Sequence, residues 1–93
     1  NKIKSNKIIQ YLATQAIQNS EVDAVKSESY YYLGRCSQIQ EDFESAFQNY
    51  SKSCQLNPDQ MLGQFGLGQM YLYKGFYLFL FFFVNYFDNI SYF

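Results

Sequence analysis

Residues 27–60 read SESYYYLGRCSQIQEDFESAFQNYSKSCQLNPDQ, and this stretch decides the fold. In its first half, Ser27 to Gln40, small and aromatic side chains recur at three- and four-residue steps, which is typical of one helix face. The second half, Asp42 to Leu56, shows the same spacing and begins with a residue suited to an N-cap. Asn57-Pro58 ends it, because proline cannot continue a helix and disfavours helical geometry in the residue before it. The stretch predicts two helices joined by a short turn.

The same pattern returns 34 residues later. Leu33-Gly34 recurs as Leu67-Gly68, and the turn residue Glu41 is matched by Gly75. Paired helices with this period are the mark of the tetratricopeptide (TPR) repeat, in which stacked hairpins bury a shared core. The sequence therefore predicts an all-α fold of TPR-type antiparallel helical hairpins, stacked as a fragment of an α-solenoid.

The repeat divides the chain. Residues 1–75 are expected to form the TPR region, in which 2–19 is the second helix of a preceding repeat, 27–60 is a full repeat and 61–74 is the first helix of the next. In the first of these segments the residues predicted to share one helix face are Ile9, Leu12, Ala13 and Ala16.

Small residues inside the full repeat explain how its helices approach each other. Gly34 and Ala46 carry too little side chain to hold two antiparallel helices apart. The aromatic residues that fall at the packing positions of the repeat are Tyr30, Phe43, Tyr50 and Tyr71. Two residues depart from the TPR pattern, which usually has an aromatic residue at the place of Ser37 and an alanine at the place of Ser53. We expect these departures to loosen the repeat without changing its fold.

Residues 76–93 have a different composition from the rest of the chain. They contain ten of the 20 phenylalanines and tyrosines, and Phe76 to Val84 is an unbroken apolar run. Leu80 and Phe87 stand where the repeat needs small residues, so we expect this tail to depart from the repeat. Three interpretations stay open, namely a membrane anchor, a buried helix of a larger assembly, and an end produced by truncation or a wrong coding boundary. Asn85 and Asp88 interrupt the run before the roughly 20 apolar residues that a membrane-spanning helix needs.

The composition excludes several classes of function. Seven basic against eight acidic residues give a net charge of −1, which argues against direct binding of nucleic acid. There is no histidine, so catalytic triads and zinc sites that need one are excluded. Cys36 and Cys54 are read as unpaired thiols, and two thiolates do not complete a metal site. We expect no enzymatic activity, no metal and no cofactor. Because the chain begins with Asn1 rather than methionine, we expect its true amino terminus to be missing.

Two other motifs carry no predicted chemistry. The glycines at 66, 68 and 75 lack the spacing of a phosphate-binding loop and lie inside a helical pattern. The carboxylates of Glu41, Asp42 and Glu44 cluster at a solvated turn, where we expect them to favour the start of a helix rather than hydrolysis.

Three runs carry a closer resemblance. Residues 28–35 (ESYYYLGR), 40–50 (QEDFESAFQNY) and 64–75 (QFGLGQMYLYKG) are similar to the large TPR scaffold subunits of the RNA polymerase II-associated factor (PAF) complex. The resemblance covers about residues 7–75. It implies a nuclear scaffold without enzymatic activity that binds other protein subunits of this complex and acts with the RNA polymerase II machinery in transcription elongation.

The TPR resemblance also implies a binding surface. In this family the first helix of each repeat lines a concave groove that takes a peptide or a partner helix. Carried to this sequence, the groove is lined by Glu28, Tyr31, Arg35, Gln38, Leu62, Phe65, Gln69 and Tyr73. The residues predicted to bind a partner are Tyr31, Arg35, Gln38, Phe65, Gln69 and Tyr73. Tyrosine and arginine are enriched at binding hot spots. The alternative is that Tyr31 or Phe65 packs against a neighbouring repeat that lies outside this sequence.

Two alternative functions stay open. TPR adaptors of chaperones hold a terminal carboxylate with lysine and asparagine side chains on the same faces. Here Tyr31 and Arg35 stand at two of those places and Gly66 at another, so a single arginine would have to form the clamp. The other alternative is a TPR protein anchored in a membrane by residues 76–93.

Overall fold

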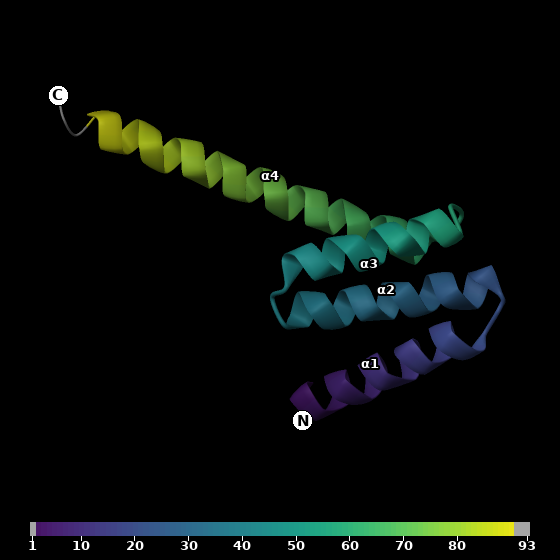
Figure 1. Cartoon of the computed structure of the whole chain (residues 1–93). Coiled ribbons are helices and arrows are strands. Elements are labelled where there is room, and N and C mark those ends of the chain that lie inside the picture. The colour runs from purple at the N-terminus through teal and green to yellow at the C-terminus, as the bar shows by residue number, and fades with distance from the viewer. Residues whose placement is uncertain (1, 91–93) are drawn as a thin grey trace.

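A computed structural model of the chain describes residues 2–90 (Figure 1). Over this range the chain forms four helices and no strand: α1 (Lys2–Asn19), α2 (Asp23–Ile39), α3 (Phe43–Leu56) and α4 (Met61–Ile90). Successive helices run in opposite directions, with α2 between α1 and α3, and α4 returning along α3 (Figure 1). The predicted all-α architecture of antiparallel helical hairpins is confirmed.

The turn between α2 and α3 is built as the sequence predicts. Asp42 is the N-cap of α3, and its carboxylate accepts a hydrogen bond from the backbone N–H of Ser45 at 3.2 Å. Glu41 adopts a positive φ of 63°, a left-handed conformation that glycine adopts more readily than other residues. At its other end α3 stops at Leu56, just before the predicted Asn57-Pro58 breaker. Sequence-encoded caps therefore fix both ends of α3.

The second helix begins four residues before the predicted start at Ser27. α2 begins at Asp23, directly after an N-cap at Val22. The hydroxyl of Ser20 accepts a hydrogen bond from the backbone N–H of Val22 at 3.1 Å, which holds the short link from α1. Asp23 in the first turn interacts favourably with the positive end of the helix dipole. These local interactions extend α2 toward the amino terminus.

The core is centred on Tyr50 of α3, whose side chain is 1% exposed. It packs with Tyr31 of α2, Ala46 of α3 and Met70 of α4. Gly34 is needed for this arrangement, because a Cβ added there would lie 2.5 Å from the Tyr50 ring. A Cβ at Gly66 of α4 would meet the same ring. One aromatic ring therefore sits between two glycines on two different helices.

Hydrogen bonds explain the two serines that depart from the TPR pattern. The hydroxyl of Ser53 lies 3.2 Å from that of Ser27, which donates to the Ser53 carbonyl at 2.7 Å, and both residues are fully buried. The hydroxyl of Ser37 lies 3.3 Å from that of Ser45 and accepts a hydrogen bond from the Asn49 amide. Polar pairs across the α2–α3 hairpin thus take the place of the usual apolar contacts.

The first helix covers one side of α2 with only part of its predicted face. Ala13 is buried, together with Asn6, which the apolar pattern did not include. Ile9 and Leu12 are 42% and 59% exposed, so the predicted shared face is only partly buried. The reason is that α1 packs against α2 alone among the described helices, which buries a narrower stripe than two neighbours would.

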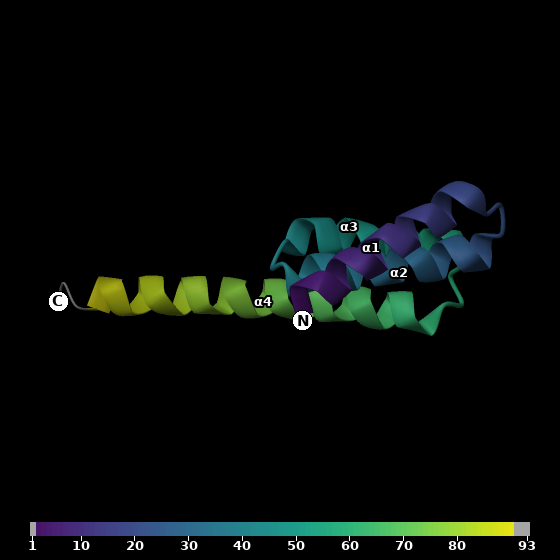
Figure 2. The same cartoon turned by 90° about the horizontal axis from the view of Figure 1, so that it is seen from below.

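The fourth helix does not end at the predicted boundary. We expected a helix over residues 61–74, whereas α4 continues through Gly75 to Ile90. No proline interrupts it, and Gly75 does not adopt a positive φ, so the backbone ladder has nothing to stop it. Figure 2 shows residues beyond Gly75 projecting from the other helices as a single rod. The molecule is consequently elongated, with extents of 62 × 32 × 16 Å.

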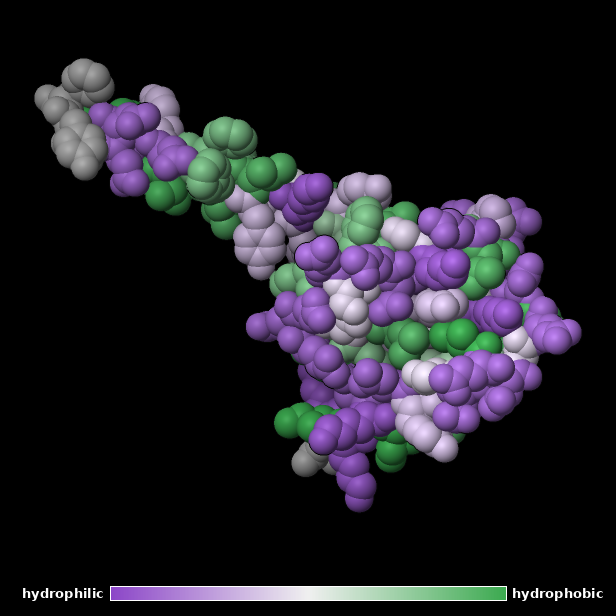
Figure 3. All heavy atoms as spheres, in the orientation of Figure 1, coloured by the Kyte–Doolittle hydropathy of each residue, from purple (hydrophilic) through white to green (hydrophobic). Residues whose placement is uncertain are grey.

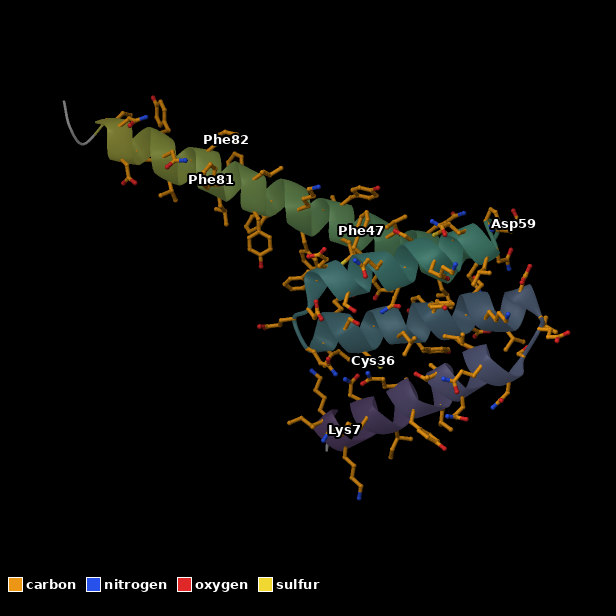
Figure 4. The ribbon with its side chains drawn as sticks, in the orientation of Figure 1. Lys7, Cys36, Phe47, Asp59, Phe81 and Phe82 are labelled. Carbon is orange, nitrogen blue, oxygen red and sulfur yellow. The ribbon has the colours of Figure 1, made fainter. Side chains whose placement is uncertain are left out.

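The projecting part of α4 is apolar and exposed. Phe81 and Phe82 lie on it (Figure 4) and are 61% and 67% exposed. In the space-filling view apolar side chains gather along this rod (Figure 3). By length and composition alone, α4 is long and apolar enough to cross a membrane, and very little of it is buried.

Candidate functional site: a cavity between α2 and α4

Five of the six residues predicted to bind a partner line one cavity of about 310 Å³. Residues of α2 and α4 that are 34 positions apart, such as Arg35 and Gln69, both line it. The helix α2 contributes Tyr31, Arg35 and Gln38, and α4 contributes Phe65 and Gln69. The volume is at the lower end of the range for ligand pockets. Five residues predicted from the repeat spacing thus lie together in the structure, and their role in binding a partner stays a prediction.

The sixth residue, Tyr73, lies elsewhere. It lines an apolar groove of about 620 Å³ between α3 and α4, and its ring centroid is 5.7 Å from that of Phe43. The groove also contains Phe47, Met70 and Phe81. Tyr73 is four residues after Gln69, but in this structure its ring packs on α3 rather than on the cavity.

A chain of hydrogen bonds fixes the floor of the cavity. The Tyr50 hydroxyl donates to the Gln38 Oε1 atom at 2.8 Å, and the Gln38 Nε2 atom donates to the Gln69 Oε1 atom at 3.5 Å. Burial raises the pKa of Tyr50 to about 12, so its hydroxyl stays protonated at neutral pH and acts as the donor. The direction of this chain leaves the Gln69 Nε2 atom to donate to a ligand.

Arg35 provides the positive charge of the cavity. Its Nη1 atom donates to the Tyr31 hydroxyl at 3.2 Å, and its guanidinium lies 6.0 Å from the centre of the Tyr31 ring. This hydrogen bond raises the pKa of Arg35 above its usual value. Among the described residues that line the cavity there is no carboxylate, so Arg35 is its one charged side chain.

Two residues that line the cavity were absent from the predicted set, Tyr50 and Ile39. Tyr50 was read from the repeat as a packing residue, which it is, but its hydroxyl also reaches the floor of the cavity. Conversely, Tyr31 was expected to line the groove. Its side chain is only 6% exposed, because its ring belongs to the core. Long aromatic side chains serve both the core and the cavity, which helix periodicity alone does not reveal.

The side chains that line the cavity are of kinds that can bind a peptide. It combines a guanidinium, two amides and the exposed ring of Phe65, which suits a peptide that offers carbonyl or carboxylate oxygens beside an apolar side chain. Within the described part of the chain no group of three or more histidine, cysteine or acidic side chains could hold a metal ion. Cys36 is buried between α1 and α2 (Figure 4), and burial raises the pKa of its thiol, as it does for Cys54.

The fold and the sequence repeat define the class of this chain, which is an all-α arrangement of antiparallel helical hairpins with a 34-residue period. No protein-family model matches it, and no solved structure gives a significant match. Among curated proteins, it is similar to the RNA polymerase-associated protein CTR9 of Caenorhabditis elegans, with 36% identity over 64 residues. This match confirms the resemblance seen in the sequence. The aligned region covers 68% of this chain and 6% of CTR9, so the chain spans a small part of its relative.

Proposed function

We propose that this chain is part of a protein-interaction scaffold, a fragment of a TPR subunit of the PAF complex that acts in RNA polymerase II transcription elongation in the nucleus. Residues 2–19, 27–60 and 61–74 serve as parts of three successive repeats. The partners are other protein subunits of this machinery. The scaffold has no enzymatic activity and binds no nucleic acid directly.

The observation that carries this proposal is the cavity between α2 and α4. Five residues chosen from the repeat pattern line it, and its charge comes from Arg35 alone. Similarity to an RNA polymerase-associated protein supports the choice of partners. In this proposal the guanidinium of Arg35 and the amide of Gln69 hold the partner's peptide oxygens, and Phe65 packs against its apolar side chains.

A pulldown tests the proposal. The full 93-residue chain, immobilised, is mixed with purified PAF-complex subunits. We expect it to capture at least one of them, and Arg35→Ala to weaken capture by roughly tenfold or more, as for a hot-spot residue. Lys52→Ala is the matched control, because it removes one positive charge from an exposed position on α3 outside the cavity. Failure to capture any subunit, or equal loss with both variants, would contradict the proposal.

A membrane-anchored TPR protein is the second candidate, favoured by the length and apolar surface of α4. In that case the chain would float with phospholipid vesicles in a density gradient, and removal of residues 76–93 would abolish flotation. The scaffold proposal predicts that most of the chain stays in the aqueous fractions. A chaperone adaptor is a weaker alternative, since a single arginine would have to hold the terminal carboxylate; competition by a peptide ending in free acidic residues would support it.

A further inference from the structure

We propose that the cavity between α2 and α4 binds the side-chain carboxylate of an internal aspartate or glutamate in a partner peptide, and that Arg35 and Gln69 hold this carboxylate. The inference rests on the proposed function, because it names the kind of peptide that the same cavity takes. It follows from the hydrogen-bond donors that the cavity offers, from its charge and from the apolar side chains at its edges.

The polar side chains of the cavity offer more hydrogen-bond donors than acceptors. The Tyr31 hydroxyl oxygen already accepts a hydrogen bond from Arg35. The side-chain oxygens of Gln38 and Gln69 also accept one hydrogen bond each, from Tyr50 and from Gln38 respectively. A guanidinium has five N–H groups, of which the bond to Tyr31 uses one, and the Gln69 Nε2 atom is a further donor. An occupant that accepts hydrogen bonds therefore fits the cavity.

The charge of the cavity fits an occupant with a single negative charge. Arg35 is the one charged side chain among the described residues that line it. A carboxylate brings one negative charge, and its two oxygens can pair with two N–H groups of the guanidinium. A phosphate group carries about two negative charges at neutral pH, and the second would have no opposite charge among the lining residues. The cavity therefore favours a carboxylate over a phosphorylated residue.

The use of the acceptor oxygens favours a side-chain carboxylate over the carboxylate at the end of a chain. A terminal carboxylate is attached to the backbone, so the last backbone N–H group of the peptide would enter the cavity with it. The side-chain oxygens of Tyr31, Gln38 and Gln69 are already paired, and an N–H group buried without an acceptor weakens binding. A side-chain carboxylate instead enters on an apolar stem.

Apolar side chains at the edges of the cavity suit such a stem and the residues beside it. Phe65 on α4 is 63% exposed and Ile39 on α2 is 47% exposed, so each wall of the cavity contributes an apolar contact. The methylene groups of aspartate and glutamate can lie against these side chains while the charged group reaches Arg35. We therefore expect the acidic residue of the partner to have apolar neighbours.

A titration with short peptides tests the class of ligand. The probe is an acetylated and amidated peptide with the sequence leucine-alanine-glutamate-alanine-leucine, and its partner for comparison has glutamine in place of glutamate. The dissociation constants are measured from the backbone amide shifts of the ¹⁵N-labelled 93-residue chain. We expect the glutamate peptide to bind at least tenfold more tightly, because hydrogen bonds to a charged group are stronger. Equal dissociation constants for the two peptides would overturn the proposal.

Two variants of basic residues test the role of Arg35. Arg35→Gln removes the positive charge at an exposed position, and circular dichroism checks that the helices are kept. We expect the preference for the glutamate peptide to fall below about twofold. Lys52→Gln is the matched control, because it removes one positive charge from an exposed position outside the cavity and should keep the tenfold preference. Equal loss of the preference in both variants would show that only the overall charge matters.

A variant of Gln69 tests the same site while Arg35 is kept. Gln69→Glu places a carboxylate of nearly the same shape in the wall of the cavity, where it competes with the peptide for the guanidinium. We expect the glutamate peptide to bind roughly tenfold more weakly and the glutamine peptide to change little. Gln48→Glu adds the same charge at an exposed position of α3 and should leave both peptides unaffected. Undiminished binding of the glutamate peptide to Gln69→Glu would contradict the assigned site.

Two further peptides separate the side-chain carboxylate from other anions. One has phosphoserine in place of glutamate, and the other lacks an acidic side chain but ends in a free carboxylate. Binding of either that is tighter than that of the glutamate peptide would overturn the proposal. These results are independent of the pulldown with PAF-complex subunits. Capture of a subunit through Arg35, together with equal binding of the glutamate and glutamine peptides, would leave the proposed function intact and contradict only the class of ligand.

Discussion

Tyr50 links the core of this molecule to its candidate binding cavity. Its ring is held between Gly34 and Gly66, and its hydroxyl donates to Gln38 on the floor of the cavity. A change in the packing of this ring would therefore displace the amides that face a ligand. The sequence alone predicted Tyr50 as a packing residue, but the hydroxyl contact depends on the reach of a long side chain from a different helix.

The first residue-scale prediction compares two equivalent glycines. Gly34→Ala places a Cβ 2.5 Å from a rigid ring and should lower the free energy of unfolding by roughly 1–3 kcal/mol. Gly68→Ala is the matched variant one repeat later, where nothing lies within 4 Å, and should raise it by about 1 kcal/mol. Urea unfolding, followed by circular dichroism at low protein concentration, measures both. Equal effects would contradict the described packing of Tyr50.

The second residue-scale prediction concerns how the stability of the protein depends on pH. Burial raises the pKa of Tyr50 to about 12 from its ordinary value near 10, so the folded state holds this proton more tightly than the unfolded state. The associated stability is complete below about pH 10 and is lost as the pH rises through about 12. We expect the difference in unfolding free energy between wild type and Tyr50→Phe to shrink over that range. A constant difference would show that Tyr50 ionises normally when folded.

At the scale of the elements, short-range interactions decided which boundaries could be predicted. Asp42 and Pro58 act on the residues next to them, and α3 has the predicted ends. The end of α4 depends on what residues 76–90 pack against, which no local pattern encodes, and the helix passes the predicted boundary at Lys74. Tyr73 is separated from the other predicted binding residues because its ring packs on Phe43 of α3.

The element-scale prediction concerns the continuity of α4. Gly75→Ala should stabilise the protein by roughly 1 kcal/mol, because a helical backbone accepts alanine and no neighbour lies within 4 Å. If Gly75 instead formed a turn with positive φ, as Glu41 does, alanine would be strained and would destabilise the protein. A rise in the urea concentration at the midpoint of unfolding indicates stabilisation by Gly75→Ala, and a fall indicates destabilisation.

At the scale of the whole molecule, the core is small for 93 residues. Six apolar residues are buried among residues 2–90, and much of α4 is exposed. Helical repeats gain stability mainly from their neighbours, and at least three are usually needed. The 34-residue period could predict this architecture and which faces of α2 and α4 line the cavity, because both follow from the order of the helices. It could not predict how far the apolar rod extends, because no proline or positive-φ glycine marks an end to the helix after Lys74.

The corresponding prediction is low and broad thermal stability for the chain at low concentration. We expect circular dichroism to show gradual loss of helix on heating, without a sharp transition. A sharp transition that does not depend on concentration would show that the single chain is sufficient for cooperative folding.

Hydrogen exchange of the chain, alone and bound to a PAF-complex subunit, tests the central claim most directly, because it locates the contact surface. If the cavity between α2 and α4 is the binding site, exchange slows on binding mainly in residues 31–39 and 65–69, which include its lining except for Tyr50. Slower exchange confined to α1 or to residues 76–90, with the cavity segments unchanged, would contradict the assignment of the site.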